Sequence, residues 1–162
     1  MEKLTERIDG PKISKDLDNI TPIDIAGDVP YFNDFTEFRK WVADTLSNLG
    51  VVCIKETGQD ILLSRAGAKR GLKGFRKDGH IKIYNDFKRL AENAKYAGVR
   101  YKNNKFPQDV FKQKFKHRET TYDLYLFADV LKNGELNYAG HKAEISDSIP
   151  TAANSAVAIG DI

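Results

Sequence analysis

The sequence predicts one α+β domain in which N-terminal helices pack on a small antiparallel β-sheet. Two patterns carry this prediction: apolar residues recur at helical spacing over residues 35–49, and a strand–turn–strand pattern covers residues 122–145. A length of 162 residues fits one domain with its own core. The one cysteine, Cys53, excludes an internal disulfide framework and a cysteine-based metal site.

The chain divides into three parts. Residues 1–30 carry scattered Asp and Pro with weak periodicity, which predicts a flexible arm or linker with a short extended piece near Ile23–Ile25. Residues 31–148 are expected to form the folded domain, and residues 149–162 a C-terminal tail. The first residues do not resemble a signal peptide, and no apolar run reaches the roughly 18 residues of a spanning helix. We therefore expect a cytoplasmic protein without a membrane partner.

The clearest helix covers residues 35–49. Asp34 can cap its first turn, with Glu37 in the capping-box position, and Gly50 is a typical stop. We interpret its apolar stripe as core rather than as a binding platform. The stripe consists of Phe35, Phe38, Trp41, Val42, Thr45, Leu46 and Leu49.

Shorter elements fill the middle of the chain. Ser64 can cap a short helix over residues 66–72. A further helix is expected over residues 86–94, with an inner face of Phe87, Leu90, Ala91 and Ala94. The remaining elements are a hairpin of residues 51–57 and 61–63, a strand over residues 96–102, and a long, mobile, basic loop over residues 103–116.

A C-terminal hairpin is marked by Asn133-Gly134, the preferred pair of a two-residue type I′ turn. One face of this hairpin is expected to point to the core and to include His141, which we interpret as a core histidine. The other face, which includes Tyr138, is mixed and partly acidic. The register that follows pairs Leu131 with Leu136, Leu126 with His141 and Tyr122 with Ile145.

Positive charge is concentrated in the middle of the chain. Residues 61–118 hold 17 Lys and Arg against 4 Asp and Glu, whereas residues 1–60 hold 7 against 12 and residues 119–162 hold 2 against 7. Such an asymmetry indicates contact with a polyanion, most simply RNA. A lysine-rich solvated face is the alternative.

Several classes of chemistry lack their sequence patterns. His80, His117 and His141 do not stand at metal-ligand spacing, and the carboxylates form no metal-binding motif. Neither a Walker sequence nor Gly-x-Gly-x-x-Gly is present, and Ser/His/Asp or Cys/His catalysis has no local signature. We therefore expect neither a metal nor a cofactor.

Metal-independent RNA cleavage fits the residue types that are present. It uses the ribose 2′-OH as the nucleophile and needs a general base, a general acid and cations for the developing charge. The segment 114–122 offers His117 for proton transfer, Arg118 for bidentate phosphate pairing, and Thr120 or Thr121 as a hydrogen-bond donor. A basic loop that leads into a strand is the alternative.

A second basic cluster covers residues 65–77 and contains no acid. Lys69 and Lys73 lie one turn apart on the predicted short helix. Ser64 and Arg65 lie at its N-terminus, where backbone N–H groups favour anions. A phosphate cradle and a solvated helix face both fit this pattern.

The order of the elements also points to a family. The helix 35–49 is followed by Ser64-Arg65-Ala66-Gly67-Ala68-Lys69, then by Glu92-Asn93-Ala94-Lys95-Tyr96 and by the Asn-Gly hairpin. This order resembles a barnase–EndoU–colicin–RelE-like nuclease domain of the polyvalent proteins of phages and conjugative elements. The second segment is similar to that family's Ser-Arg-x-Gly-x-Lys pattern, and the similarity covers roughly residues 34–146.

The resemblance implies a microbial-RNase-like fold and metal-independent endoribonuclease activity, as a toxin or effector acting on RNA. A non-catalytic module of the same fold that binds nucleic acid or a host protein is the alternative. A cognate inhibitor or a host protein is a further expected partner, and the resemblance leaves open carriage in a virion or delivery to a host cell. The expected catalytic residues are His117, Arg118, Thr120 and Lys69, and the expected nucleic-acid contacts are Ser64, Arg65, Arg70, Lys73, Arg76, Lys77, Arg100 and Lys116.

Overall fold

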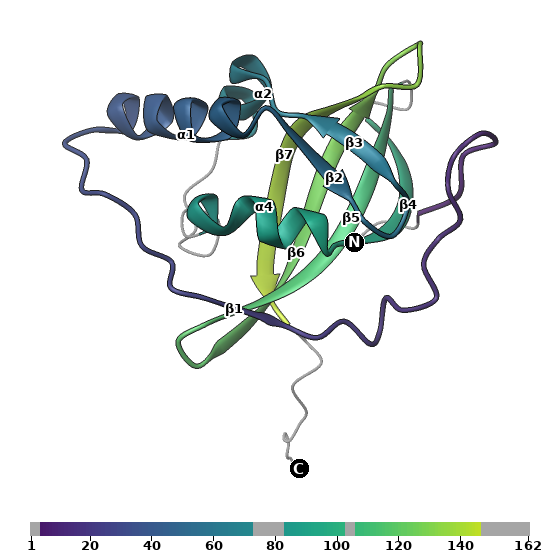
Figure 1. The fold of residues 1–162 in the computed structure, drawn as a ribbon, viewed down its shortest axis with the longest axis horizontal. Helices are drawn as coiled ribbons and strands as arrows, with labels where there is room; N and C mark the ends of the chain where they lie inside the picture. The colour runs from purple at the N-terminus through teal and green to yellow at the C-terminus, as the bar shows by residue number, and fades with distance from the viewer. Residues whose placement is uncertain (1–3, 73–82, 103–105, 147–162) are drawn as a thin grey trace.

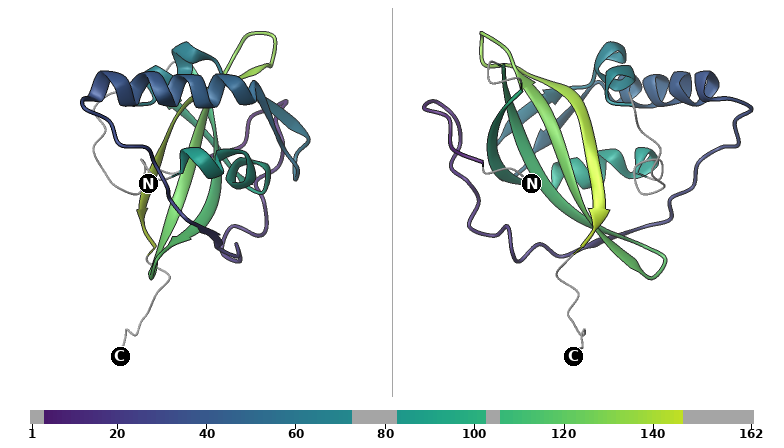
Figure 2. Two further views of the ribbon diagram at one scale, coloured as in Figure 1. Left: turned by 60° about the vertical axis from the view of Figure 1, so that its left-hand side comes forward. Right: turned by 180° about the vertical axis from the view of Figure 1, so that it is seen from behind.

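A computed structural model of the chain describes residues 4–72, 83–102 and 106–146. The strands of these residues form one strongly curled sheet with the shape of a half-barrel, and the helices lie on its concave side (Figure 1, Figure 2). More of the described residues lie in strands than in helices. The predicted fold class, α+β with N-terminal helices on a small antiparallel sheet, is therefore wrong: the sheet dominates the molecule.

The described strands are β1 (Ile23–Ile25), β2 (Val51–Ile54), β3 (Gln59–Leu62), β4 (Lys95–Lys102), β5 (Phe106–His117), β6 (Thr120–Val130) and β7 (Leu136–Ile145). Their order across the sheet is β1-β5-β6-β7-β3-β2, and β4 pairs with the first half of β5. Most neighbours are antiparallel, but β1 runs parallel to β5 and β3 runs parallel to β7. The sheet is therefore mixed, and the predicted extended piece at residues 23–25 is confirmed as β1.

The helical elements are α1 (Phe35–Leu49), α2 (Arg65–Arg70), the 3-10 turn η1 (Tyr84–Asp86) and α4 (Phe87–Glu92). The predicted caps are confirmed. The Asp34 side chain accepts a hydrogen bond of 2.9 Å from the Glu37 backbone N–H, and α1 ends at Gly50 with φ +74°. The Ser64 hydroxyl accepts a bond of 3.0 Å from the Gly67 N–H and so caps α2.

The main core lies between the concave face of the sheet and the helices. Phe38, Val42 and Leu46 of α1 are buried there, which confirms the interpretation of the apolar stripe as core, although Phe35 is exposed. The predicted inner face of α4 is buried as well, and it consists of Phe87, Leu90, Ala91 and Ala94.

Residues 103–116 were expected to form a mobile loop, and that prediction is wrong for residues 106–116, which belong to the 12-residue strand β5. Phe111 and Phe115 are fully buried on one face, whereas Lys112 and Lys116 alternate with them on the other face. The lysines make the segment look like a loop by composition, but its alternation is that of a strand with one buried face. Because β5 pairs with β1, β4 and β6, this misplaced strand accounts for much of the error in fold class.

The predicted C-terminal hairpin forms from β6 and β7, but its turn has three residues rather than two. The Leu131 N–H donates a hydrogen bond of 2.8 Å to the Glu135 carbonyl, and Gly134 adopts φ +88°. Such a turn shifts the register beside it by one residue. Leu136 therefore opposes Val130, and the predicted pairing of Leu131 with Leu136 is wrong.

A β-bulge then restores the predicted register. Phe127 opposes Gly140, whereas the next residue, Ala128, opposes Tyr138, so that Ala139 is the extra residue. The shifted register places Tyr138 in the core rather than on the outer face where it was expected. Beyond the bulge the predicted pairs are confirmed, and they are Leu126 with His141 and Tyr122 with Ile145.

The N-terminal segment covers the outer edge of β4. Thr5 forms a β-bridge with Val99, and the Ser14 N–H donates a hydrogen bond of 2.9 Å to the Tyr96 carbonyl. Leu4 packs on a second, smaller apolar cluster that includes Phe127. Because the neighbours of Phe127 on β6 belong to the main core, this cluster lies on the convex face. The segment thus protects a strand edge that would otherwise expose unpaired backbone groups.

Candidate nucleic-acid interface

A row of polar side chains crosses the convex face of the sheet. Arg100 of β4, Gln108 of β5 and Asp129 of β6 occupy opposed positions on neighbouring strands. Arg100 Nε donates to Gln108 Oε1 at 3.0 Å, and Gln108 Nε2 donates to Asp129 Oδ1 at 2.8 Å. Arg70 of α2 reaches the same carboxylate, with 3.5 Å between Nη1 and Oδ2. The guanidinium carbon of Arg100 lies 3.6 Å from the ring centroid of Phe127, which orients this cation on the sheet.

A pocket of about 540 Å³ adjoins this row. Arg70, Lys102, Phe106 and Asp129 line it together with small apolar groups. Phe106 is 63% exposed and opposes Lys102, so both lie on the same face of the sheet as Arg100 and Gln108. Cations and an accessible aromatic ring thus lie together at this pocket, which is the combination that binds a single nucleic-acid strand. We call the surface formed by Arg70, Arg100, Lys102 and Phe106 the basic–aromatic surface.

Two glycines let α2 pack against β7 and so position Arg70. A Cβ atom on Gly67 would lie 2.3 Å from the Tyr138 carbonyl oxygen, and one on Gly71 would lie 2.8 Å from Gly140 Cα. Side chains at these positions would force the helix away from the strand. The same glycines lower helix propensity in the sequence, but here they allow a close contact between backbones.

The other predicted α2 residues contact the protein itself. Arg65 forms an ion pair with Asp44 of α1, and this contact is the main cause that lowers the pKa of the Asp44 carboxyl. Lys69 is half-buried, and its charge also lowers that pKa. The Ser64 hydroxyl is occupied as the cap of α2. The predicted contacts Lys73, Arg76 and Lys77 lie outside the described residues.

The remaining predicted catalytic residues lie at the β5–β6 turn. His117 is buried and opposes Thr120 across the hairpin, and Arg118 between them is exposed with φ +57°. The predicted contact Lys116 precedes them on β5.

This turn and α2 lie at opposite ends of the sheet (Figure 1). α2 touches β7 at Gly140, which opposes Phe127, and Phe127 is separated from Thr120 by seven positions along β6. At about 3.3 Å per residue the separation is on the order of 20 Å. The structure therefore does not bring Lys69 together with His117, Arg118 and Thr120.

Not every lysine of the basic segment before this turn is exposed at the surface. Lys114 is 6% exposed, and its Nζ lies 2.6 Å from Asp123 Oδ1 and 2.8 Å from the Ser146 hydroxyl. A buried, paired ammonium of this kind supports the sheet and is not presented to a ligand.

Sequence reasoning missed four residues of the basic–aromatic surface and its polar row: Lys102, Phe106, Gln108 and Asp129. The alternation of lysine with aromatic and apolar residues over 106–117 could have revealed the strand that carries two of them. The contact between Gln108 and Asp129 could not have been found in this way, because it depends on the register between two strands.

Within the described part of the chain, no three histidine, cysteine or carboxylate side chains gather as a group that could hold a metal ion. None of the described helices is both long and apolar enough to cross a membrane.

The chain matches a known protein family. Residues 33–138 match the family described as Large polyvalent protein-associated domain 3. The match extends from just before α1 into β7, so it includes every residue of the basic–aromatic surface. No curated protein and no solved structure matches the chain. The predicted link to polyvalent proteins is confirmed, whereas the nuclease identity stays a prediction.

Proposed function

Because the chain belongs to the Large polyvalent protein-associated domain 3 family, we propose that it is an RNA-binding module of a phage or mobile-element polyvalent protein. Its binding surface is the basic–aromatic surface. The observation that carries the proposal is the convergence of Arg70 and Lys102 with the exposed ring of Phe106 at one pocket, beside Arg100, which donates to the lining residue Gln108.

Electrostatics support a polyanion at this surface despite the one carboxylate within it. Asp129 interacts with Arg70 and accepts a hydrogen bond from Gln108. Three cations and one anion give the surface a net positive charge. When these cations neutralise phosphates, the strand releases its condensed counterions, and this release favours association. The exposed ring of Phe106 adds base stacking, which contributes about 1–3 kcal/mol per base and tolerates any sequence.

Equilibrium binding of a labelled single-stranded oligouridine, followed by fluorescence anisotropy, tests the proposal. Arg70→Gln and Lys102→Gln should each weaken binding several-fold and reduce the salt slope by roughly 0.7, which is the change for one phosphate contact on a single strand. Phe106→Ala should weaken binding about tenfold through lost stacking, with little change in slope. Lys12→Gln is the matched control because its side chain is 90% exposed and lies outside the surface. Equal affinity of all four variants and the natural sequence would refute the proposal.

Metal-independent RNA cleavage by a toxin-like domain is the second candidate function. It is favoured by the β5–β6 turn, where the exposed Arg118 adopts a left-handed backbone conformation between His117 and Thr120. A two-residue hairpin turn requires this positive φ, and it holds the Arg118 cation at the tip of the hairpin beside His117. Gel analysis of the RNA from the same titration, performed in EDTA, separates the two candidates. Cleavage that His117→Ala abolishes would establish the second, whereas binding with intact RNA excludes it for that RNA.

A further inference from the structure

A second pocket, of about 510 Å³, lies between β3 and the β6–β7 turn and is lined by acidic rather than basic side chains. Asp60 and Glu135 line it, and none of its lining residues is a lysine or an arginine. In a chain with 26 lysines and arginines, such a surface is unsuited to a nucleic acid. We call it the acceptor pocket, because carboxylates and carboxamides supply its polar groups.

The rim of the acceptor pocket is apolar and accessible. Val51 and Leu62 oppose each other on β2 and β3, and they are 45% and 48% exposed. Leu131, the residue after β6, is 38% exposed and also lines the pocket beside the basic–aromatic surface. These three side chains offer an apolar contact beside the carboxylates.

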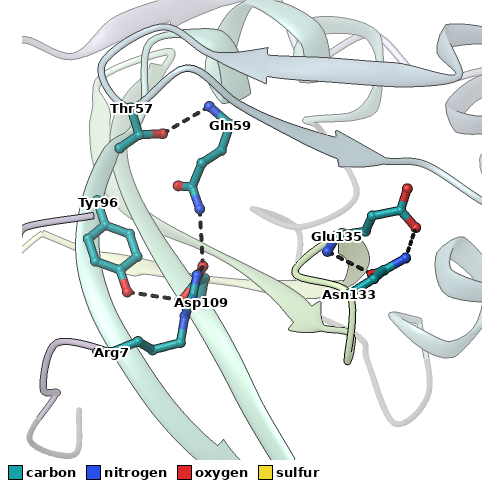
Figure 3. Close-up of polar contacts among 7 residues, drawn as sticks. All are labelled: Arg7, Thr57, Gln59, Tyr96, Asp109, Asn133 and Glu135. Carbon is teal, nitrogen blue, oxygen red and sulfur yellow. Dashed lines mark hydrogen bonds and ion pairs between the residues drawn. The ribbon is translucent and has the colours of Figure 1, made fainter. Parts of the chain in front are cut away.

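Hydrogen bonds hold the acceptors of this pocket in place. Asn133 Nδ2 donates to Glu135 Oε1 at 2.8 Å, and the Glu135 N–H donates to Asn133 Oδ1 at 3.0 Å, which fixes the carboxylate on the turn (Figure 3). Asn137 lines the same pocket, and its Oδ1 atom is buried without a hydrogen-bond partner among the described residues. A buried acceptor of this kind is unfavourable until a donor reaches it.

We propose that the acceptor pocket binds an arginine side chain of a protein partner. A guanidinium group has five N–H donors in a planar fork that pairs with carboxylates, and it is less strongly hydrated than an ammonium group. Its aliphatic stem can lie along the leucines of the rim while its charge meets Asp60 and Glu135. This site is separate from the basic–aromatic surface, so a bound partner and bound RNA would lie on opposite sides of the β6–β7 hairpin.

Two-dimensional ¹H–¹⁵N NMR with the blocked dipeptide acetyl-leucyl-arginine amide tests this proposal. Titration should shift the backbone amides of Asp60, Gly134 and Glu135 and should saturate in the millimolar range, as expected for so small a ligand. The citrulline analogue has the same shape without the charge, and it should bind at least about fivefold more weakly.

Substitutions of the two carboxylates test whether the dipeptide binds in the acceptor pocket. Glu135→Gln and Asp60→Asn should each weaken binding of the arginine dipeptide about fivefold. Glu144→Gln, at the far end of β7, should leave it unchanged. The NMR spectrum of each variant shows whether the protein is folded. If Glu135→Gln disturbs the turn, Asp60→Asn still tests the proposal, because Asp60 is exposed and lies outside the turn. Equal binding of the citrulline analogue, insensitivity to both variants, or no saturable shift at these amides would overturn the proposal. None of these outcomes depends on RNA binding.

Discussion

Asp109 is a carboxylate whose side chain has no exposed surface, and residues from three other segments surround it (Figure 3). Arg7 of the N-terminal segment binds it through two hydrogen bonds of 2.9 and 2.7 Å. The Tyr96 hydroxyl donates to it at 2.9 Å, and Gln59 of β3 donates at 3.4 Å. Burial beside this carboxylate raises the pKa of Tyr96, so the tyrosine stays a donor. One residue thus ties the N-terminal segment, β3 and β4 to β5.

Replacing Arg7 should destabilise the protein because Asp109 would be left as an unpaired buried charge. We expect Arg7→Met to lower the free energy of unfolding by about 3 kcal/mol, measured by urea denaturation. The double variant Arg7→Met with Asp109→Asn should recover part of that loss, since it removes the charge. Lys12→Met is the control on the same segment, and a change for Arg7→Met as small as that of the control would contradict this account.

Only some residues of the basic–aromatic surface could be predicted from the sequence. Arg70 and Arg100 follow from the charge pattern, because a cation in a basic block is an expected phosphate contact. Arg65 fits the same pattern equally well, yet it pairs with Asp44. Charge in the sequence identifies cations, but only the fold shows that Arg65 lies beside Asp44 of α1 whereas Arg70 lines the pocket at the basic–aromatic surface.

At the scale of elements, the contact between α2 and β7 decides where the cations of α2 point. Gly67→Ala should test it, since alanine favours a helix by about 1 kcal/mol over glycine. In this structure the added Cβ would meet the Tyr138 carbonyl oxygen at 2.3 Å, and a backbone atom cannot yield cheaply. We therefore expect thermal denaturation to show a net loss of stability above about 1 kcal/mol.

Ala66 provides the matched comparison on the same helix. It is exposed, so Ala66→Gly should destabilise by about 1 kcal/mol through helix propensity alone. Gly67→Ala and Ala66→Gly would then both destabilise, although they change helix propensity in opposite directions. A stabilised Gly67→Ala variant would show that α2 does not lie against β7.

The pairing of α1 with α2 should depend on pH. Arg65 lowers the pKa of the Asp44 carboxyl in the folded protein. The stabilisation from this pair is therefore present above the ordinary pKa of aspartate and is lost as the pH falls through the lowered folded value. Urea midpoints between roughly pH 5 and pH 3 should fall less steeply for Asp44→Asn than for the natural sequence. Asp9→Asn, in the N-terminal segment, is the control, and identical pH profiles for all three proteins would contradict the prediction.

The sequence predicted those elements whose ends and buried faces are marked by residues within the element or next to it. The cap at Asp34 and the stop at Gly50 fixed α1, and the alternation in residues 122–145 fixed the hairpin outside its turn. The parallel pairs β1–β5 and β3–β7 join segments far apart in the chain, and no local pattern records them. The fold class was missed for that reason and because the lysines of β5 concealed its alternation.

At the scale of the whole molecule, the β6–β7 hairpin separates two surfaces of opposite charge. The basic–aromatic surface lies on one side of Leu131 and the acceptor pocket on the other. The third group of interest, His117 and Arg118, lies at the far end of the sheet. The proposed activities therefore rest on different side chains, although Leu131 lines both pockets.

Photo-crosslinking tests the proposal that RNA lies on the basic–aromatic surface. Irradiation of the protein with a single-stranded RNA that contains 4-thiouridine, followed by mass spectrometry of the peptides, would identify the residues in contact with bases. We predict a crosslink at Phe106 that is lost at high salt. Crosslinks confined to residues 117–122 at the β5–β6 turn, or no crosslinks under conditions where the RNA binds, would contradict the claim.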